Sequence, residues 1–187
     1  MRDTSRYTVN GQRVVSVTEA LVISGVVDFS GVPLDLLEAA RERGRRVHEL
    51  CAEVARGDIE NLEPEFAPYV DAFCQFLETS GFKPHLIEHP VVNERYRYAG
   101  TLDLTGDLDG EMILIDIKTG RSPRWAGLQL AGYALAFAPT TLKRFSLELR
   151  PDGGYRLKPF RSYADYPDFL ACVRIAQWLI KERGIVL

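Results

Sequence analysis

The sequence has no apolar run long enough to cross a bilayer, for which about 20 consecutive apolar residues are needed. Its beginning, MRDTSRYTVN, also has no apolar segment of the kind found in secretory signal peptides. We therefore expect a soluble, cytoplasmic protein with no membrane partner. Internal repeats and low-complexity linkers are also absent, so we expect the 187 residues to form a single domain.

Cysteine is scarce. Three cysteines are present at wide spacings, with no C-x-x-C pair: Cys51, Cys74 and Cys172. An odd number at such spacings argues against a disulfide framework, a zinc site or an iron–sulfur cluster. Each cysteine has apolar neighbours in the sequence, so we expect all three to be small residues of the core.

A large net charge is absent too. The 23 basic and 26 acidic residues give a net charge of −3, which excludes a bulk polycation for nucleic acid. The charges are nevertheless unevenly distributed. Residues 117–161 contain nine basic and two acidic residues, whereas residues 46–116 contain five basic and fifteen acidic ones. This asymmetry permits a local phosphate-binding surface on a mildly acidic protein.

Turn and capping signals divide the chain into helices and strands. Asn10-Gly11 predicts the turn of an N-terminal hairpin, and Ser16 with Glu19 forms a capping box that starts a short helix. Helical spacing between Pro and Gly residues predicts helices over residues 33–56, 64–79, 125–137 and 166–182. Strand patterns cover residues 82–93, 96–108, 112–117, 142–149 and 155–160. The order indicates an α/β fold with one mixed sheet flanked by helices.

Two charged residues, Asp116 and Lys118, interrupt the apolar strand predicted at EMILIDIKTG. Residues i and i+2 of a strand point to the same face, so this carboxylate and ammonium project together. The flanking Ile115 and Ile117 face the other way, into apolar packing. Because withdrawing two charges from water is costly unless they pair or bind a metal, we expect one of these two arrangements.

Asp103 lies on the preceding predicted strand, and the turn Asp109-Gly110 is about midway between it and Asp116. We therefore expect the two aspartates to be close to cross-strand partners. Adjacent carboxylates repel unless one is protonated or a cation bridges them, and hard oxygen ligands suit Mg²⁺ or Mn²⁺. A lysine beside such a metal orients water and stabilises charge on a phosphorane. The pattern predicts phosphodiester hydrolysis; the alternative is a structural domain in which Asp116 and Lys118 merely pair.

The segments GTLD, IDIKTG and QLAGY, in this order, resemble the PD-(D/E)XK nuclease superfamily in its RecB-like exonuclease branch. That branch includes phage exonucleases and the mitochondrial genome maintenance exonuclease. The resemblance covers Gly44 to about Phe137, and SVTEAL is more loosely similar to phage members. It implies a restriction-endonuclease-like fold. It also implies catalytic roles for three residues, namely Asp103, Asp116 and Lys118.

The resemblance also implies a set of metal ligands. The branch carries a metal-ligating histidine in a G-x-x-x-H context on an upstream helix, and Gly44 to His48 matches it. The ligands of Mg²⁺ or Mn²⁺ would then be His48, Asp103, Asp116 and the backbone carbonyl of Ile117. Several members hold an iron–sulfur cluster with four cysteines, and the three scattered cysteines of this chain exclude that variant.

Gln129 and Tyr133 match the Q-x-x-x-Y helix of the same branch, and their spacing puts them on one helix face. The resemblance places them on the substrate strand or around the catalytic lysine. The alternative is a partly buried polar pair that packs the helix on the sheet. Arg121 and Arg124 follow the catalytic strand directly, so we expect them to contact backbone phosphates without reading sequence.

Other residues are less specific candidates. Trp125 is available to stack on a base or to pack. Glu53 and Glu88 are candidates for a second metal site, and the sequence assigns neither to it. Four arginines on the helix predicted at residues 33–56 form either a substrate contact or a solvated face: Arg41, Arg43, Arg45 and Arg46.

We therefore expect a metal-dependent DNA nuclease, bacterial or phage-encoded, and the resemblance implies an exonuclease that hydrolyses single-stranded ends in repair, recombination or replication. Polarity, oligomeric state and the choice of DNA over RNA are left open. A helicase or recombinase is a candidate partner protein. Two alternatives remain: a phage recombination exonuclease that processes double-stranded ends, and a non-catalytic nucleic-acid-binding subunit with the same fold. Retention of every catalytic motif residue counts against the latter.

Overall fold

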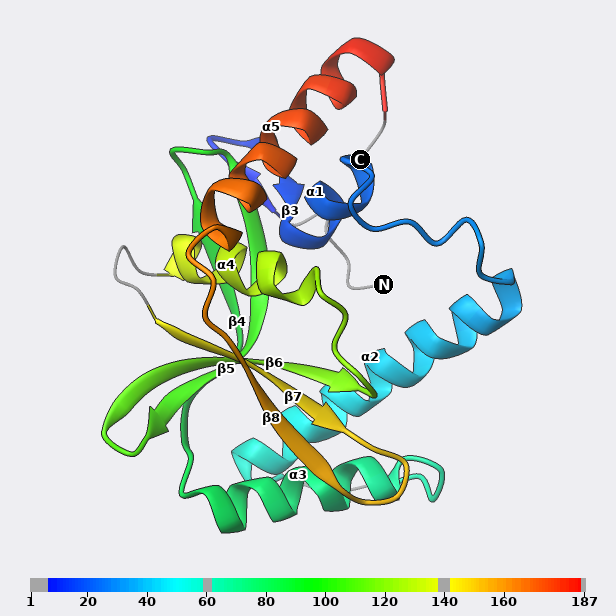
Figure 1. Ribbon diagram of the computed structural model, residues 1–187, viewed down its shortest axis with the longest axis vertical. Helices are drawn as coiled ribbons and strands as arrows, with labels where there is room; N and C mark the ends of the chain where they lie inside the picture. Colours follow the sequence, from blue (N-terminus) through cyan, green and yellow to red (C-terminus); the bar gives the residue numbers. More distant parts are fainter. Residues whose placement is uncertain (1–6, 59–61, 138–141, 186–187) are drawn as a thin grey trace.

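The computed structural model describes residues 7–58, 62–137 and 142–185. Within these ranges the chain forms eight strands and five helices (Figure 1). The strands are β1 (Thr8–Val9), β2 (Gln12–Arg13), β3 (Val15–Ser16), β4 (Lys83–Asn93), β5 (Tyr98–Leu108), β6 (Glu111–Thr119), β7 (Lys143–Leu149) and β8 (Tyr155–Phe160). The helices are α1 (Val17–Ile23), α2 (Leu34–Arg56), α3 (Ala67–Ser80), α4 (Ala126–Phe137) and α5 (Asp165–Arg183). No helix in the described part of the chain has both the length and the hydropathy needed to span a membrane.

The main sheet is mixed. Strands β4, β5 and β6 form an antiparallel meander, and α4 then crosses over to β7, which runs parallel to β6. Strand β8 returns antiparallel to β7, and the two-residue strand β3 pairs in parallel with the start of β5. This arrangement confirms the predicted α/β fold with a mixed sheet and flanking helices.

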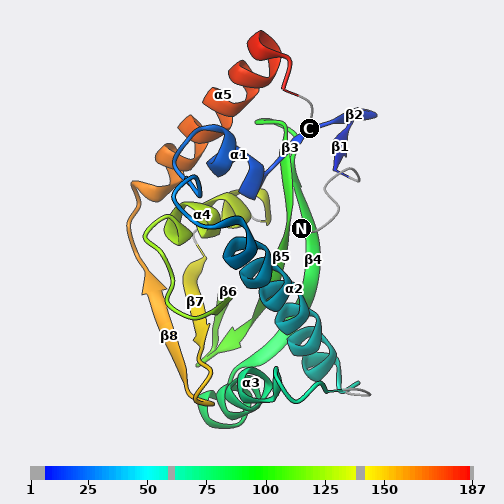
Figure 2. The ribbon, with the colours of Figure 1, turned by 90° about the vertical axis from the view of Figure 1, so that its right-hand side faces the viewer.

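Helices cover both faces of the sheet, over two separate apolar cores. One core joins α1, α4 and α5 to the sheet and includes Leu114 of β6. The other joins α2 and α3 to the sheet and includes Ile115 and Ile117. In Figure 2, α2 runs diagonally across the sheet, while α1, α4 and α5 group together at one end. The alternation along β6 therefore places Asp116 and Lys118 on the α4 face, opposite the two isoleucines, as predicted.

Strand β5 changes its partner along one edge. Strand β4 occupies the other edge over most of its length, from Asp107 back to Tyr98. On the second edge, β3 pairs with Tyr98 and Ala99, and β6 pairs only from Leu104 onward. Residues 100–103 therefore have no strand partner on this edge within the described chain. The interruption ends at Asp103, so this residue lies at the point where the pairing of β5 with β6 stops.

The turn and capping signals in the sequence are confirmed locally. Asn10 and Asp109 adopt positive φ angles of 53° and 56° before glycines, as the predicted hairpin turns require. The capping box is formed, with Ser16 Oγ accepting from the backbone N–H of Glu19 at 3.1 Å. Helix α2 ends at Gly57, whose φ is 87°.

Two expectations need correction. Helix α3 begins at Ala67 rather than residue 64, because Pro68 has no N–H and fits only in the first turn of a helix. Cys51 and Cys172 are buried in the core as expected, whereas Cys74 is only partly buried.

Candidate metal centre

Asp103 and Asp116 meet at the end of the β5–β6 ladder. The final pair of the ladder is Leu104 with Ile115, so one further step brings Asp103 opposite Asp116, as predicted. At that step the Asp103 side chain takes the place of a strand partner: Oδ2 accepts a hydrogen bond of 2.8 Å from the backbone N–H of Ile117. The carboxylate is thus fixed at the point where the strands separate.

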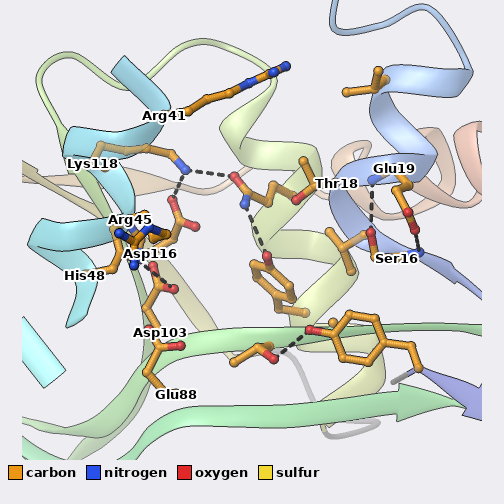
Figure 3. A pocket seen from close by; sticks show the side chains of 18 of the residues that line it. Ser16, Thr18, Glu19, Arg41, Arg45, His48, Glu88, Asp103, Asp116 and Lys118 are labelled. Atoms are coloured by element: carbon orange, nitrogen blue, oxygen red, sulfur yellow. Dashed lines mark hydrogen bonds and ion pairs between the residues drawn. The ribbon is translucent and has the colours of Figure 1, made fainter. Parts of the chain in front are cut away.

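Three potential ligands converge beside this carboxylate. His48 from α2, Glu88 from β4 and Asp103 from β5 each offer an atom, and these atoms lie within 4.8 Å of one another (Figure 3). His48 Nδ1 lies 3.2 Å from Asp103 Oδ1. Ligand atoms about 2.1 Å from one divalent ion are about 3 to 4 Å apart, so small side-chain shifts bring this set to bonding distance. The residues present therefore fit a divalent metal ion.

Glu88 is the residue that sequence analysis left unassigned. The pairs Ile87–Leu104 and His89–Leu102 place it opposite Asp103 on the neighbouring strand. Its φ of 51° is in the left-handed region, which is unfavourable for a non-glycine residue in a strand. Such strain collects at functional sites, where the surrounding structure maintains it. Neither the register nor this conformation has a signal in the sequence.

Asp116 and Lys118 form an ion pair next to the three converging ligands. Lys118 Nζ lies 2.7 Å from Asp116 Oδ2, and their side chains are 19% and 2% exposed. Burial, and secondarily the nearby Asp103 carboxylate, raises the pKa of Asp116 above its usual range despite the opposing effect of Lys118. The charged form of Asp116 is therefore disfavoured in the protein without metal, and a bound cation would favour it.

Gln129 and Tyr133 extend the polar network from Lys118. Lys118 Nζ donates to Gln129 Oε1 at 2.9 Å, and Gln129 Nε2 donates to Tyr133 Oη at 3.2 Å. Trp125 adds an aromatic ring whose centroid is 5.6 Å from the same ammonium. Gly100 of β5 leaves room for Tyr133, since a Cβ there would lie 2.7 Å from Tyr133 Cε1. Of the predicted alternatives, the structure thus shows Gln129 placed around the lysine.

A cavity of about 880 Å³ opens at this network and is bounded by α1, α2, β5, β6 and α4. Its acidic lining residues are Glu19, Glu49, Glu53, Glu88, Asp103 and Asp116. Its lysines and arginines are Arg41, Arg45, Arg56 and Lys118. The lining thus combines carboxyl groups with fixed cations, and a bound metal ion would add positive charge that favours a phosphate ligand.

Some predicted site residues lie apart from the three converging ligands. Asp116 adjoins that set and is paired with Lys118 rather than belonging to it. Ile117 is next to Asp103 through its N–H, and its carbonyl remains a predicted ligand. Arg121 and Arg124 are exposed in the loop that follows β6, outside the cavity lining.

Two arginines of the α2 cluster, Arg45 and Arg46, are paired with nearby acidic residues. Arg45 pairs with Glu42 and Glu49 at 2.5 and 2.6 Å. Arg46 pairs with Glu63 at 2.8 Å. These contacts favour the solvated-face interpretation for both arginines, although Arg45 also borders the cavity.

Comparisons with known proteins give limited similarity. No protein-family model matches the chain. A search of curated proteins finds no match either. Among solved structures, the chain is similar to LHK-Exo in complex with dAMP, with 14% identity, a TM-score of 0.40 and coverage of 91% of this chain and 93% of that one. A second structure, the alkaline exonuclease LHK-Exo from Laribacter hongkongensis, gives 16% identity, a TM-score of 0.35 and the same coverage. Similarity at this level does not establish a family.

Proposed function

We propose that this chain is a metal-dependent nuclease that hydrolyses phosphodiester bonds of DNA. One observation carries the proposal: His48, Glu88 and Asp103 converge beside the buried Asp116–Lys118 pair, inside one cavity. A structural ion pair needs no such surroundings. The three converging side chains offer ligands to a divalent cation, and Lys118 lies beside them, where it can contact a phosphate group.

The proposed ligands come from four elements. His48, Glu88 and Asp103 would hold the metal, and Asp116 with the Ile117 carbonyl would complete its surroundings on β6. The metal would be Mg²⁺ or Mn²⁺, because carboxylate and carbonyl oxygens dominate the set. When bound, it supplies a Lewis acid that polarises phosphoryl oxygen and lowers the pKa of water.

Lys118 has the remaining catalytic role. Its ammonium orients the attacking water and stabilises the negative charge that develops on the phosphoryl oxygens. Asp116 and Gln129 fix the ammonium by contacts of 2.7 and 2.9 Å. Gln129 and Tyr133 act as positioning residues on this account, since the hydrogen bond between them restrains the amide that accepts from Lys118.

The proposed substrate is single-stranded DNA with a free end, cleaved during repair, recombination or replication. This part rests on the resemblance of the motifs to RecB-like exonucleases. The cavity volume of about 880 Å³ lies within the range of about 300–1,000 Å³ found for ligand-binding pockets. A double-strand exonuclease of a phage recombination system is the alternative within the same chemistry.

The proposal is tested with linear single-stranded, circular single-stranded and linear double-stranded DNA, each incubated with Mg²⁺ or Mn²⁺ and separately with EDTA. We expect loss of the linear single strand with metal only, and persistence of the circle. Preferential loss of linear duplex would instead support the double-strand alternative. Binding without cleavage of any substrate would show a non-catalytic nucleic-acid-binding subunit, and absence of both binding and metal affinity would show a structural domain.

A further inference from the structure

Four exposed arginines on the β6–β8 side of the site have no carboxylate partner within the described part of the chain: Arg121, Arg124, Arg156 and Arg161. No carboxylate oxygen of a described residue lies within 4.0 Å of their guanidinium groups. Two arginines of α2 differ, because Arg45 and Arg46 are paired with glutamates. Unpaired cations at an exposed surface remain available for an external anion.

The sheet register places part of this charge on the face of the sheet that carries Lys118. Across β6, β7 and β8, Lys118 is aligned with Glu148 and then Arg156. The adjacent row aligns Asp116 with Ser146 and then Lys158. Neighbouring strands are about 4.8 Å apart, so the backbone positions of Arg156 and Lys158 lie about 10 Å across the sheet from Lys118 and Asp116 on β6.

The loop between β6 and α4 spans this distance and is anchored on β7 and β8. Ser122 donates its backbone N–H to Glu148 Oε1 at 2.9 Å, and its hydroxyl is 2.5 Å from that of Ser146. Lys158 Nζ donates to the Ser122 carbonyl at 3.1 Å. Arg121 and Arg124 flank this anchored residue. The loop thus carries positive charge from the end of β6 across β7 to β8.

The acidic residues near this loop do not cancel its charge. Glu148 is only 5% exposed and accepts a hydrogen bond from Ser122, so its carboxylate is covered. Asp165 is paired with the buried Arg144 at 3.1 Å. Asp152, in the turn before β8, lies 3.7 Å from Arg150. The charged side chains that the loop and β8 themselves expose are therefore basic, although the chain as a whole carries a charge of −3.

We propose that Arg121, Arg124, Arg156 and Lys158 form one surface, the β8 surface, that binds the sugar-phosphate backbone of single-stranded DNA outside the cavity. The surface leads from Lys118 across the loop and along β8 toward Arg161 and Tyr163. Tyr163 is 74% exposed, and an exposed aromatic ring is a platform on which an unpaired base stacks. This inference rests on the proposed function, and it adds where the substrate strand lies beyond the bond that is cleaved.

Binding of a fluorescent oligothymidine in EDTA, over a series of salt concentrations, tests the β8 surface without cleavage. Arg156→Ala should weaken binding several-fold at low salt and reduce the slope of log K against log salt by about 0.7, the value for one single-strand phosphate contact. Arg156→Lys, which retains the charge, should largely restore the slope. Lys83→Ala is the matched control, because Lys83 is exposed and unpaired among the described residues, on the opposite edge strand β4.

Equal slopes for wild type, Arg156→Ala and Lys83→Ala would overturn the proposal. Thermal unfolding of the variants shows whether a lost slope reflects lost folding, and recovery in Arg156→Lys excludes that cause. The two proposals fail separately. Metal-dependent cleavage with no effect of Arg156→Ala on the slope would reject the β8 surface alone. A reduced slope in a protein that never cleaves DNA would retain the surface and reject the nuclease.

Discussion

His48 Nδ1 lies 3.2 Å from Oδ1 of Asp103, and this contact joins helix α2 to the interrupted edge of β5. Glu88 reaches the same place from β4, in a backbone conformation unfavourable for its residue type. Three elements thus contribute ligand atoms at one position, and the backbone of Glu88 is strained there. A bound cation would link these elements directly, and any ligand specific to the folded state stabilises it.

Glu88→Gln should reduce Mn²⁺ affinity at least about tenfold, because an amide lacks the negative charge that a hard cation prefers. The change preserves side-chain size, so folding should be unaffected. Calorimetric titration with Mn²⁺ measures the effect. Glu53→Gln serves as the control, because Glu53 lines the same cavity but lies outside the three converging ligands. Equal loss of affinity in both variants would exclude a specific role for Glu88.

Gly44→Ala should stabilise the protein while impairing its function. Gly44 is in the interior of α2, and a Cβ at this position meets no heavy atom within 4 Å. Alanine is favoured over glycine in a helix by about 1 kcal/mol, so the melting temperature should rise. Gly44 also lines the cavity, so the added methyl group should raise KM for DNA.

Gly31→Ala provides the comparison, since its Cβ is equally unobstructed and Gly31 does not line the cavity. If Gly44→Ala raises the melting temperature and leaves KM at the value of Gly31→Ala, the substrate does not occupy the α2 side of the cavity.

The raised pKa of Asp116 predicts a pH-dependent stability of the metal-free protein. A carboxyl group whose folded pKa exceeds its unfolded value stabilises the protein fully below the unfolded value. This contribution is lost as the pH rises through the folded pKa, by about 1.4 kcal/mol per unit of difference. Asp116→Asn removes the ionisation, so the variant should gain stability relative to wild type as the pH rises above about 4, the ordinary pKa of an aspartate.

Urea unfolding in EDTA at several pH values measures this difference. Mn²⁺ should then favour the wild type, because the ion offsets the charge of the buried carboxylate. A difference in the free energy of unfolding between variant and wild type that does not change with pH would contradict the raised pKa of Asp116.

Gln129→Met should lower kcat by about 10- to 100-fold with a smaller change in KM. Methionine preserves much of the side-chain volume but removes the acceptor that fixes Lys118, and a hydrogen bond to a charged group contributes about 1.5–3 kcal/mol. Steady-state kinetics on single-stranded DNA provide the measurement. Tyr133→Phe, which retains the Lys118–Gln129 contact, should have a milder effect. An unchanged kcat in Gln129→Met would show that Gln129 only packs α4 against the sheet.

The sequence was sufficient for those features that depend on local signals and strand periodicity. Asp109-Gly110 determines the hairpin register, and that register brings Asp103 opposite Asp116. The same alternation places Lys118 on the face that carries Asp116. These relationships follow from residues close in the chain, whose geometry is determined by one turn.

Features that depend on distant pairings could not be predicted. Glu88 approaches Asp103 through a strand register that includes an irregularity between Pro84 and Leu86, with no turn motif to specify it. Strand β3 contains two residues, too few for periodicity, yet it defines one side of the interrupted edge of β5. The anchoring of Ser122 on Glu148 joins segments that are adjacent only after α4 has crossed over.

The central claim is that Lys118 acts in metal-dependent cleavage rather than in a structural ion pair, an arrangement in which the 2.7 Å contact would also be present. The direct measurement is single-turnover hydrolysis of end-labelled linear single-stranded DNA with Mn²⁺, comparing wild type, Lys118→Ala and the charge-matched Lys83→Ala. The account predicts cleavage by wild type and Lys83→Ala, and a loss of at least about 100-fold in Lys118→Ala with Mn²⁺ binding retained. Cleavage by Lys118→Ala at the wild-type rate, or by no variant under any metal condition, would contradict it.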